Sequence, residues 1–174
     1  MPSAVTTVLL MGALMVASAF AQSYDSQGVR AMCADVELEE CGDEPCGFYR
    51  LNEFSCVKVL TLERDFENAQ MGCELINGNL VKVQTEEEHK KLLCMMIRVF
   101  PRRIHYWIGA VRREDGYFYW FDGSGPVEFA PWREGQPDNY EGEEDCVWMN
   151  SGTWGAWNDG ACYEASSVAC QVLV

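Results

Sequence analysis

The chain is poor in basic residues and in histidine. It has 13 lysine and arginine residues against 27 aspartates and glutamates, a net charge of −14, and only two histidines. Nucleic-acid binding depends on basic side chains that neutralise phosphates, so this balance argues against such a partner. Zinc sites draw on histidine and cysteine, which makes a histidine-based zinc site unexpected. The acidic balance favours a divalent cation as partner, or serves solubility alone.

Long apolar runs are absent beyond residue 21. Residues 1–21 carry no charged side chain and end in the small-x-small pattern Ala19-Phe20-Ala21, which is typical of a secretory signal peptide cleaved before Gln22. No later stretch is long and apolar enough to cross a bilayer. We therefore expect a secreted, extracellular protein without a membrane span.

All nine cysteines lie after this segment. In a secreted chain they predict a disulfide framework, and because nine is odd, at least one thiol is free or bonded to another chain. Two arrangements stay open for Cys33, Cys41 and Cys94. One is a Cys33–Cys41 bond with Cys94 buried and free, and the other is an intermolecular bond that gives a homo-oligomer.

The mature chain divides into an acidic extension and one folded domain. Residues 22–45 are polar and lack periodicity, which predicts a loose extension before a domain over 46–174. The run CGFYRLNEFSC at 46–56 predicts a disulfide-closed hairpin. Apolar residues spaced by three or four predict a helix over 61–75.

A second helix and a set of strands follow. The capping box of Thr85 and Glu88 predicts where the helix begins, and Pro101 ends it. Aromatic and β-branched runs then predict strands at 105–111, 117–121, 145–149 and 167–172. Two helices followed by short strands indicate an α+β fold. The segment 121–145 between the second and third runs is a long loop, and such loops in small domains are often functional.

This loop carries the strongest chemical signal. The stretch EGQPDNYEGEEDC at 134–146 holds six carboxylates in thirteen residues, and WNDGAC at 157–162 adds further oxygen-bearing side chains. Ca²⁺ takes about 6–8 oxygen ligands of these kinds, and a Cys146–Cys162 bond would bring the two stretches together. The alternative is a solvated acidic loop beside a structural turn. The candidate ligands are Gln136, Asp138, Glu144, Asn158 and Asp159.

Taken in order, these features resemble the C-type lectin domain family over residues 46–171. They are Cys46, Cys56, Cys73, YWIGA at 106–110, QPD at 136–138, EDC at 144–146, WND at 157–159, Cys162 and Cys170. The resemblance implies an α+β fold with two helices packed on short antiparallel sheets. It also implies a cis peptide bond before Pro137. The implied disulfides are Cys46–Cys56, Cys73–Cys170 and Cys146–Cys162.

The resemblance also implies a function for the loop. Ca²⁺ would be held by Gln136, Asp138, Glu144, Asn158 and Asp159, and a sugar would bind the ion directly. Gln136, Asp138, Tyr140, Glu144 and Asn158 would contact that sugar. Family members with Gln-Pro-Asp resemble galactose binders, so glycans with terminal galactose or N-acetylgalactosamine are the expected partners. Tyr140 would pack on the apolar face of the sugar.

The family resemblance leads to further expectations. Arg112 and Arg113 lie near the position of an acid that helps some members hold a second calcium, so that second site is expected to be weak or absent. The expected function is a soluble, single-domain lectin for recognition or agglutination of cells or microbes. It is not an enzyme, since a glycosidase-like acid pair would leave the amide ligands unexplained. A matrix, biomineral or ice-surface protein on the same fold is the alternative.

Overall fold

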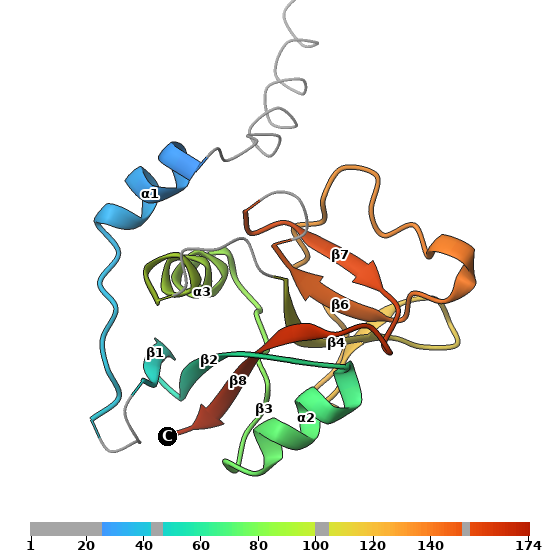
Figure 1. Ribbon diagram of the computed structural model, residues 1–174, viewed down its shortest axis with the longest axis horizontal. Helices are drawn as coiled ribbons and strands as arrows, with labels where there is room; N and C mark the ends of the chain where they lie inside the picture. The colour runs from blue at the N-terminus through green and yellow to red at the C-terminus, as the bar shows by residue number, and fades with distance from the viewer. Residues whose placement is uncertain (1–25, 43–46, 100–104, 151–153) are drawn as a thin grey trace, which may run out of the picture.

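The computed structural model describes residues 26–42, 47–99, 105–150 and 154–174 (Figure 1). The expected signal peptide, 1–21, and Cys46 lie outside these ranges. Within them, the helices are too short or too polar to pass through a bilayer. The fold is α+β, as the sequence predicts.

One mixed sheet forms the centre of the fold. Its strand order is β1-β2-β8-β4-β6-β7, with β3 paired to β8 and β5 paired to β4. The strands are β1 (Tyr49–Asn52), β2 (Ser55–Arg64), β3 (Asn79–Leu80), β4 (Tyr106–Arg112), β5 (Phe118–Trp120), β6 (Cys146–Met149), β7 (Trp157–Gly160) and β8 (Ser166–Leu173). Neighbouring strands are antiparallel except β4 and β8, whose parallel pairing joins the two halves of the sheet.

In the part of the chain that the structure describes, three α-helices accompany the sheet: α1 (Ser26–Ala34), α2 (Phe66–Glu74) and α3 (Glu86–Val99). The predicted beginning of α3 is confirmed, because the main-chain N–H of Glu88 donates to Thr85 Oγ1 at 3.2 Å. Three glutamates in its first turn and Arg98 in its last turn complement the helix dipole. In Figure 1, α2 packs below β2, β3 and β8, and the long loop (orange) lies at the opposite end.

The predicted start of the first helix at residue 61 is wrong. Residues 61–64 continue β2, where Arg64 pairs with Ser166 of β8. Asp65 caps α2 instead, since its Oδ1 accepts a 2.9 Å bond from the main-chain N–H of Asn68. The helical apolar spacing extends back to Leu62, but Leu62 is 61% exposed and the strand continues to Arg64. The predicted end near residue 75 is confirmed, because α2 ends at Glu74, and the backbone of Asn77 beyond it is left-handed, at φ 57°.

Residues 26–42 are more ordered than the sequence suggests. They contain α1, and the Cys33–Cys94 disulfide ties α1 to α3. A second disulfide, Cys41–Cys56, ties the following segment to β2. The main-chain N–H of Arg50 donates to Glu39 O at 2.8 Å, so this segment lies along β1.

Those two bonds correct the predicted cysteine pairing. Cys56 is bonded to Cys41, so the Cys46–Cys56 pair is wrong, and Cys94 is not free. Cys41 reaches Cys56 because hydrogen bonds along β1 place their Cα atoms 6.5 Å apart. The Cys33–Cys41 pair is wrong for the same reason. The other two implied bonds, Cys73–Cys170 and Cys146–Cys162, are present.

Tryptophans fill the core beneath the long loop. Trp107 and Trp157 are fully buried, and Trp120 meets the Trp157 ring edge-on at 6.3 Å between centroids. Gly109 of β4 is required by close packing, since a Cβ there would lie 2.8 Å from Leu80 O. These contacts give the loop a rigid base.

Candidate functional site

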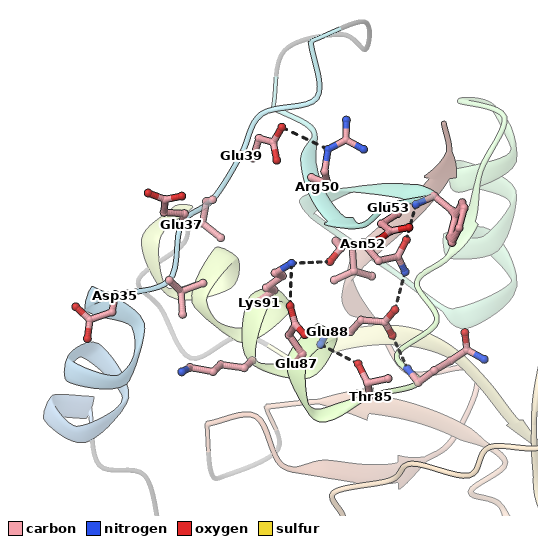
Figure 2. Close-up of a pocket in the computed structure, with 16 residues that line it drawn as sticks. Asp35, Glu37, Glu39, Arg50, Asn52, Glu53, Thr85, Glu87, Glu88 and Lys91 are labelled. Carbon is pink, nitrogen blue, oxygen red and sulfur yellow. Dashed lines mark hydrogen bonds and ion pairs between the residues drawn. The ribbon is translucent and has the colours of Figure 1, made fainter.

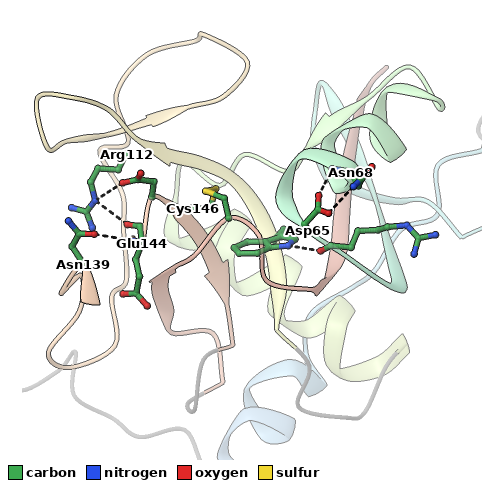
Figure 3. Close-up of a disulfide and its surroundings, with 10 residues drawn as sticks. Asp65, Asn68, Arg112, Asn139, Glu144 and Cys146 are labelled. Atoms are coloured by element: carbon green, nitrogen blue, oxygen red, sulfur yellow. Dashed lines mark hydrogen bonds and ion pairs between the residues drawn. A yellow bond between two sulfur atoms is a disulfide. The ribbon is translucent and has the colours of Figure 1, made fainter. Parts of the chain in front are cut away.

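The site begins where the long loop returns to the sheet. β6 and β7 are antiparallel neighbours, and Val147 pairs with Asp159. The Cys146–Cys162 disulfide, with 5.1 Å between Cα atoms, closes the same end. Figure 3 shows Cys146 of this bond on the strand that follows Glu144. Strand pairing and disulfide together bring the end of the loop beside the WND segment.

Three carboxylates meet at this point. Asp138, Glu144 and Asp159 each offer an oxygen, and these three atoms lie within 4.8 Å of one another. Asp159 is fully buried, Glu144 is half-buried and Asp138 is exposed. We call these three residues the carboxylate cluster. Negative charges this close repel one another unless a cation balances them.

The amide residues flanking the cluster have unfilled acceptors. Gln136 Oε1 and Asn158 Oδ1 are buried and find no hydrogen-bond partner among the described residues. The Asn158 amide nitrogen donates to the main-chain oxygen of Asp159. A buried acceptor left unpaired costs about 1–3 kcal/mol. Gln136 lies two positions before Asp138, and Asn158 directly precedes Asp159. Amide and carboxylate oxygens are the donors that a hard cation such as Ca²⁺ prefers, so the residues fit the ion.

The loop backbone forms hydrogen bonds with the same carboxylates. The main-chain N–H groups of Asp138 and Asn139 donate to the two carboxylate oxygens of Asp159, at 3.2 and 2.8 Å. Within the loop, the N–H of Tyr140 donates to Glu144 Oε2 at 3.0 Å. The peptide bond between Gln136 and Pro137 is cis, as the family resemblance implies. The loop is therefore shaped around the cluster.

The charges in the cluster act on Glu144. Burial raises the pKa of its carboxyl above the ordinary value, and the neighbouring carboxylates of Asp159 and Asp138 add to the rise. The hydrogen bond from Tyr140 opposes this effect on the pKa. Burial is the largest cause of the raised pKa, and the two neighbouring carboxylates act in the same direction.

One basic residue also belongs to the site. The guanidinium of Arg112, at the end of β4, forms an ion pair with Asp159 and donates from Nε to the main-chain oxygen of Glu144 at 3.2 Å. The sequence places Arg112 near this loop only through the family resemblance, and it gives no signal of the direct contact with Asp159. Figure 3 shows its side chain beside Glu144 and Asn139.

Tyr140 lies on the outer side of this loop. It opens the short 3₁₀ helix η1 (Tyr140–Gly142), and 65% of its surface is exposed. Its neighbour Asn139 has a left-handed backbone, at φ 47°. The structure thus brings Asp138, Glu144 and Asp159 together, sets Gln136 and Asn158 beside them in sequence, and leaves the Tyr140 ring open to solvent.

A separate groove lies between residues 35–39, the β1–β2 hairpin and the start of α3 (Figure 2). Its volume is about 1360 Å³, and none of the predicted site residues line it. Some of its charged groups bond to neighbouring side chains, as Glu88 does with Asn52 at 2.6 Å and Lys91 with Glu87 at 3.3 Å. No residue of the carboxylate cluster lines the groove, so the two places are separate.

Known proteins resemble this chain in both sequence and structure. The model of the lectin C-type domain matches residues 63–172. The C-type isolectin Sp-CL4 of Scorpaena plumieri is 37% identical over 139 residues, covering 79% of this chain and 92% of the relative. An alpha-N-acetylgalactosamine-specific lectin of Patiria pectinifera is 33% identical over 153 residues, covering 83% of this chain and 90% of the relative.

A solved structure agrees with these sequence matches. The C-type lectin CEL-I from Cucumaria echinata superposes with a TM-score of 0.67 at 26% identity, over 76% of this chain and 99% of CEL-I. The match of the family model extends from β2 to β8 and includes the whole carboxylate cluster. The chain belongs to the C-type lectin domain family.

Proposed function

We propose that the protein is a secreted, calcium-dependent lectin that binds glycans ending in galactose or N-acetylgalactosamine. The observation that carries this proposal is the carboxylate cluster, together with the unfilled buried acceptors Gln136 Oε1 and Asn158 Oδ1 of residues adjacent to it in sequence. A solvated acidic loop would leave its oxygens to water, whereas these oxygens are buried. The apparent alternative of a purely structural turn leaves the same two acceptors unexplained.

In this proposal the chain's own residues hold and orient both ligands. Asp138, Glu144 and Asp159 supply carboxylate oxygens to the ion, and Gln136 and Asn158 supply amide oxygens. When bound, the ion supplies open coordination positions for two neighbouring hydroxyl groups of a sugar. The exposed Tyr140 ring packs on the apolar face of that sugar. No catalytic step is part of the proposal.

Two observations support a galactose-type sugar. An ionised carboxylate only accepts hydrogen bonds, whereas an amide also donates, so the order Gln136-Pro137-Asp138 fixes which side of the sugar meets a donor. The Patiria pectinifera relative is described as specific for alpha-N-acetylgalactosamine. Weak single sites reach useful avidity only when several are linked, so agglutination of cells or microbes would require a homo-oligomer.

Titration calorimetry of the purified protein tests this function. Galactose and N-acetylgalactosamine should bind in millimolar calcium and should not bind in EDTA, while mannose should bind more weakly than either. Binding that persists in EDTA would contradict the calcium dependence. A mineral or ice surface bound equally well in the presence of free galactose would favour the alternative function.

A further inference from the structure

Arg112 bonds to three oxygens from three different residues. Its guanidinium pairs with the carboxylate of Asp159 and lies 3.6 Å, from Nε, from Asp145 Oδ1. The same Nε donates to the main-chain oxygen of Glu144 at 3.2 Å. Only 15% of the Arg112 side chain is exposed. Two carboxylates and a main-chain carbonyl are also ligands that a divalent cation takes.

The position of this guanidinium is fixed by packing. Its Cζ lies 4.5 Å from the centroid of the Phe118 ring on β5, which pairs with β4. The neighbouring Arg113 instead lies over the Tyr119 ring, at 4.3 Å. The last residue of β4 and the residue after it thus have different surroundings, and Arg112 is the one that pairs with Asp159 of the carboxylate cluster.

We propose that the Arg112 guanidinium is a resident cation that takes the place of a second divalent ion, so that the loop binds one calcium. This inference rests on the proposed function, because it concerns the same loop. Arginine is protonated at every physiological pH, so its charge is present whether or not calcium is bound. The guanidinium balances the negative charges of Asp145 and the buried Asp159. A single calcium ion then suffices for the carboxylate cluster.

The assignment explains an otherwise costly feature. Asp159 is fully buried, and a buried carboxylate without a counter-charge strongly destabilises a fold. Arg112 supplies that counter-charge before calcium arrives, while the main-chain N–H groups of Asp138 and Asn139 complete the hydrogen bonds. Arg112 is therefore a positioning residue for the site, as well as the occupant of the second cation position.

The test counts bound calcium ions in the full-length protein by titration calorimetry and equilibrium dialysis. Wild type should bind one ion. Arg112→Gln should bind two, because the substitution removes the resident charge and adds an amide oxygen to the three oxygens already there. The second ion should bind with a Kd of about 10⁻⁴–10⁻³ M, the range of extracellular calcium modules. Arg112→Lys keeps the positive charge and should still bind one ion.

Arg113→Gln is the matched control, since it removes an equal charge from the next residue and should leave the stoichiometry at one. Circular dichroism and a cooperative melt check the fold of each variant. Two ions bound by wild type or by Arg112→Lys, or one ion bound by a folded Arg112→Gln, would overturn the inference and leave the calcium-dependent function intact. The wild-type count tests the inference even where a variant does not fold. No ion bound by wild type would instead reject the proposed function.

Discussion

Asn139 and Asp159 join the long loop to the sheet. The main-chain N–H of Asn139 donates to Asp159 Oδ2 at 2.8 Å, although the two residues are 20 positions apart. Asp159 belongs to β7, so this hydrogen bond holds the loop backbone in a fixed position relative to the sheet. The same carboxylate contributes to the cluster, which makes it both a support for the loop backbone and a ligand in the proposed site.

Asp159→Asn should therefore weaken calcium binding by roughly 100-fold or more, because the number of charged ligands largely sets calcium affinity. Sugar binding should be lost with it. Calorimetric titrations with calcium and then with galactose measure both effects. Glu134→Ala, an exposed acid of the same loop, is the control and should leave both affinities unchanged. Full sugar binding by Asp159→Asn would reject the site.

Exchanging acid and amide around Pro137 should change the sugar without changing the ion. The double variant Gln136→Glu, Asp138→Asn keeps one carboxylate and one amide, so calcium affinity should stay roughly the same. Donor and acceptor positions are reversed, so mannose should become the stronger competitor for a glycan-coated surface. An unaltered galactose preference would show that these two side chains do not select the sugar.

Removing the Cys33–Cys94 disulfide should loosen α1 without affecting the site. The two cysteines are 61 residues apart, and closing a loop of this size typically stabilises a fold by about 2–4 kcal/mol. The double variant Cys33→Ala, Cys94→Ala should melt at a lower temperature and should be cut by proteases within residues 35–42. Calcium affinity, measured in the same preparation, serves as the control and should match wild type.

His89 should make stability depend on pH. It is buried on α3, its Nε2 lies 2.7 Å from Gly155 O, and burial lowers its pKa below the ordinary value of 6.5. The unfolded chain therefore takes up a proton before the folded one does. Stability is fully present above pH 6.5 and decreases as the pH falls toward the folded pKa, by at most about 1.4 kcal/mol per pH unit.

Urea unfolding at several pH values between 7.5 and 5 measures this effect. His89→Gln retains a donor that can reach Gly155 but does not titrate, so its stability should fall less over the same range. Carboxylates contribute equally to both proteins, and the difference between the two curves isolates His89. Parallel curves for wild type and His89→Gln would rule out this histidine as the source.

The sequence predicts well those parts of the fold that local chemistry decides. The start of α3 follows from Thr85 and Glu88, and the left-handed Asn77 follows from an Asn-Gly pair. The structure brings Asp138, Glu144 and Asp159 together, as expected for residues that precede Cys146 and Cys162 by short distances. The first two cases follow from neighbouring residues, whereas the third follows from a disulfide that joins two segments of the chain.

Features decided by distant partners could not be predicted in this way. Residues 61–64 continue the strand up to Arg64, which pairs with Ser166 of β8, and that pairing cannot be seen in the local apolar spacing. Cys41 rather than Cys46 reaches Cys56 because the extension runs along β1. Arg112 is separated from Asp159 by 47 positions, so only the folded sheet shows that the two side chains meet.

The central place of β8 has a consequence for how the protein is made. Residues 166–173 pair with β2, β3 and β4, so the two halves of the sheet cannot join until this segment has left the ribosome. Until then Cys73 cannot form its disulfide with Cys170, which lies 97 positions further along the chain. Contacts between such distant segments form slowly. During synthesis, the other thiols are therefore exposed to wrong partners, and efficient production should depend on enzymes that reshuffle disulfides.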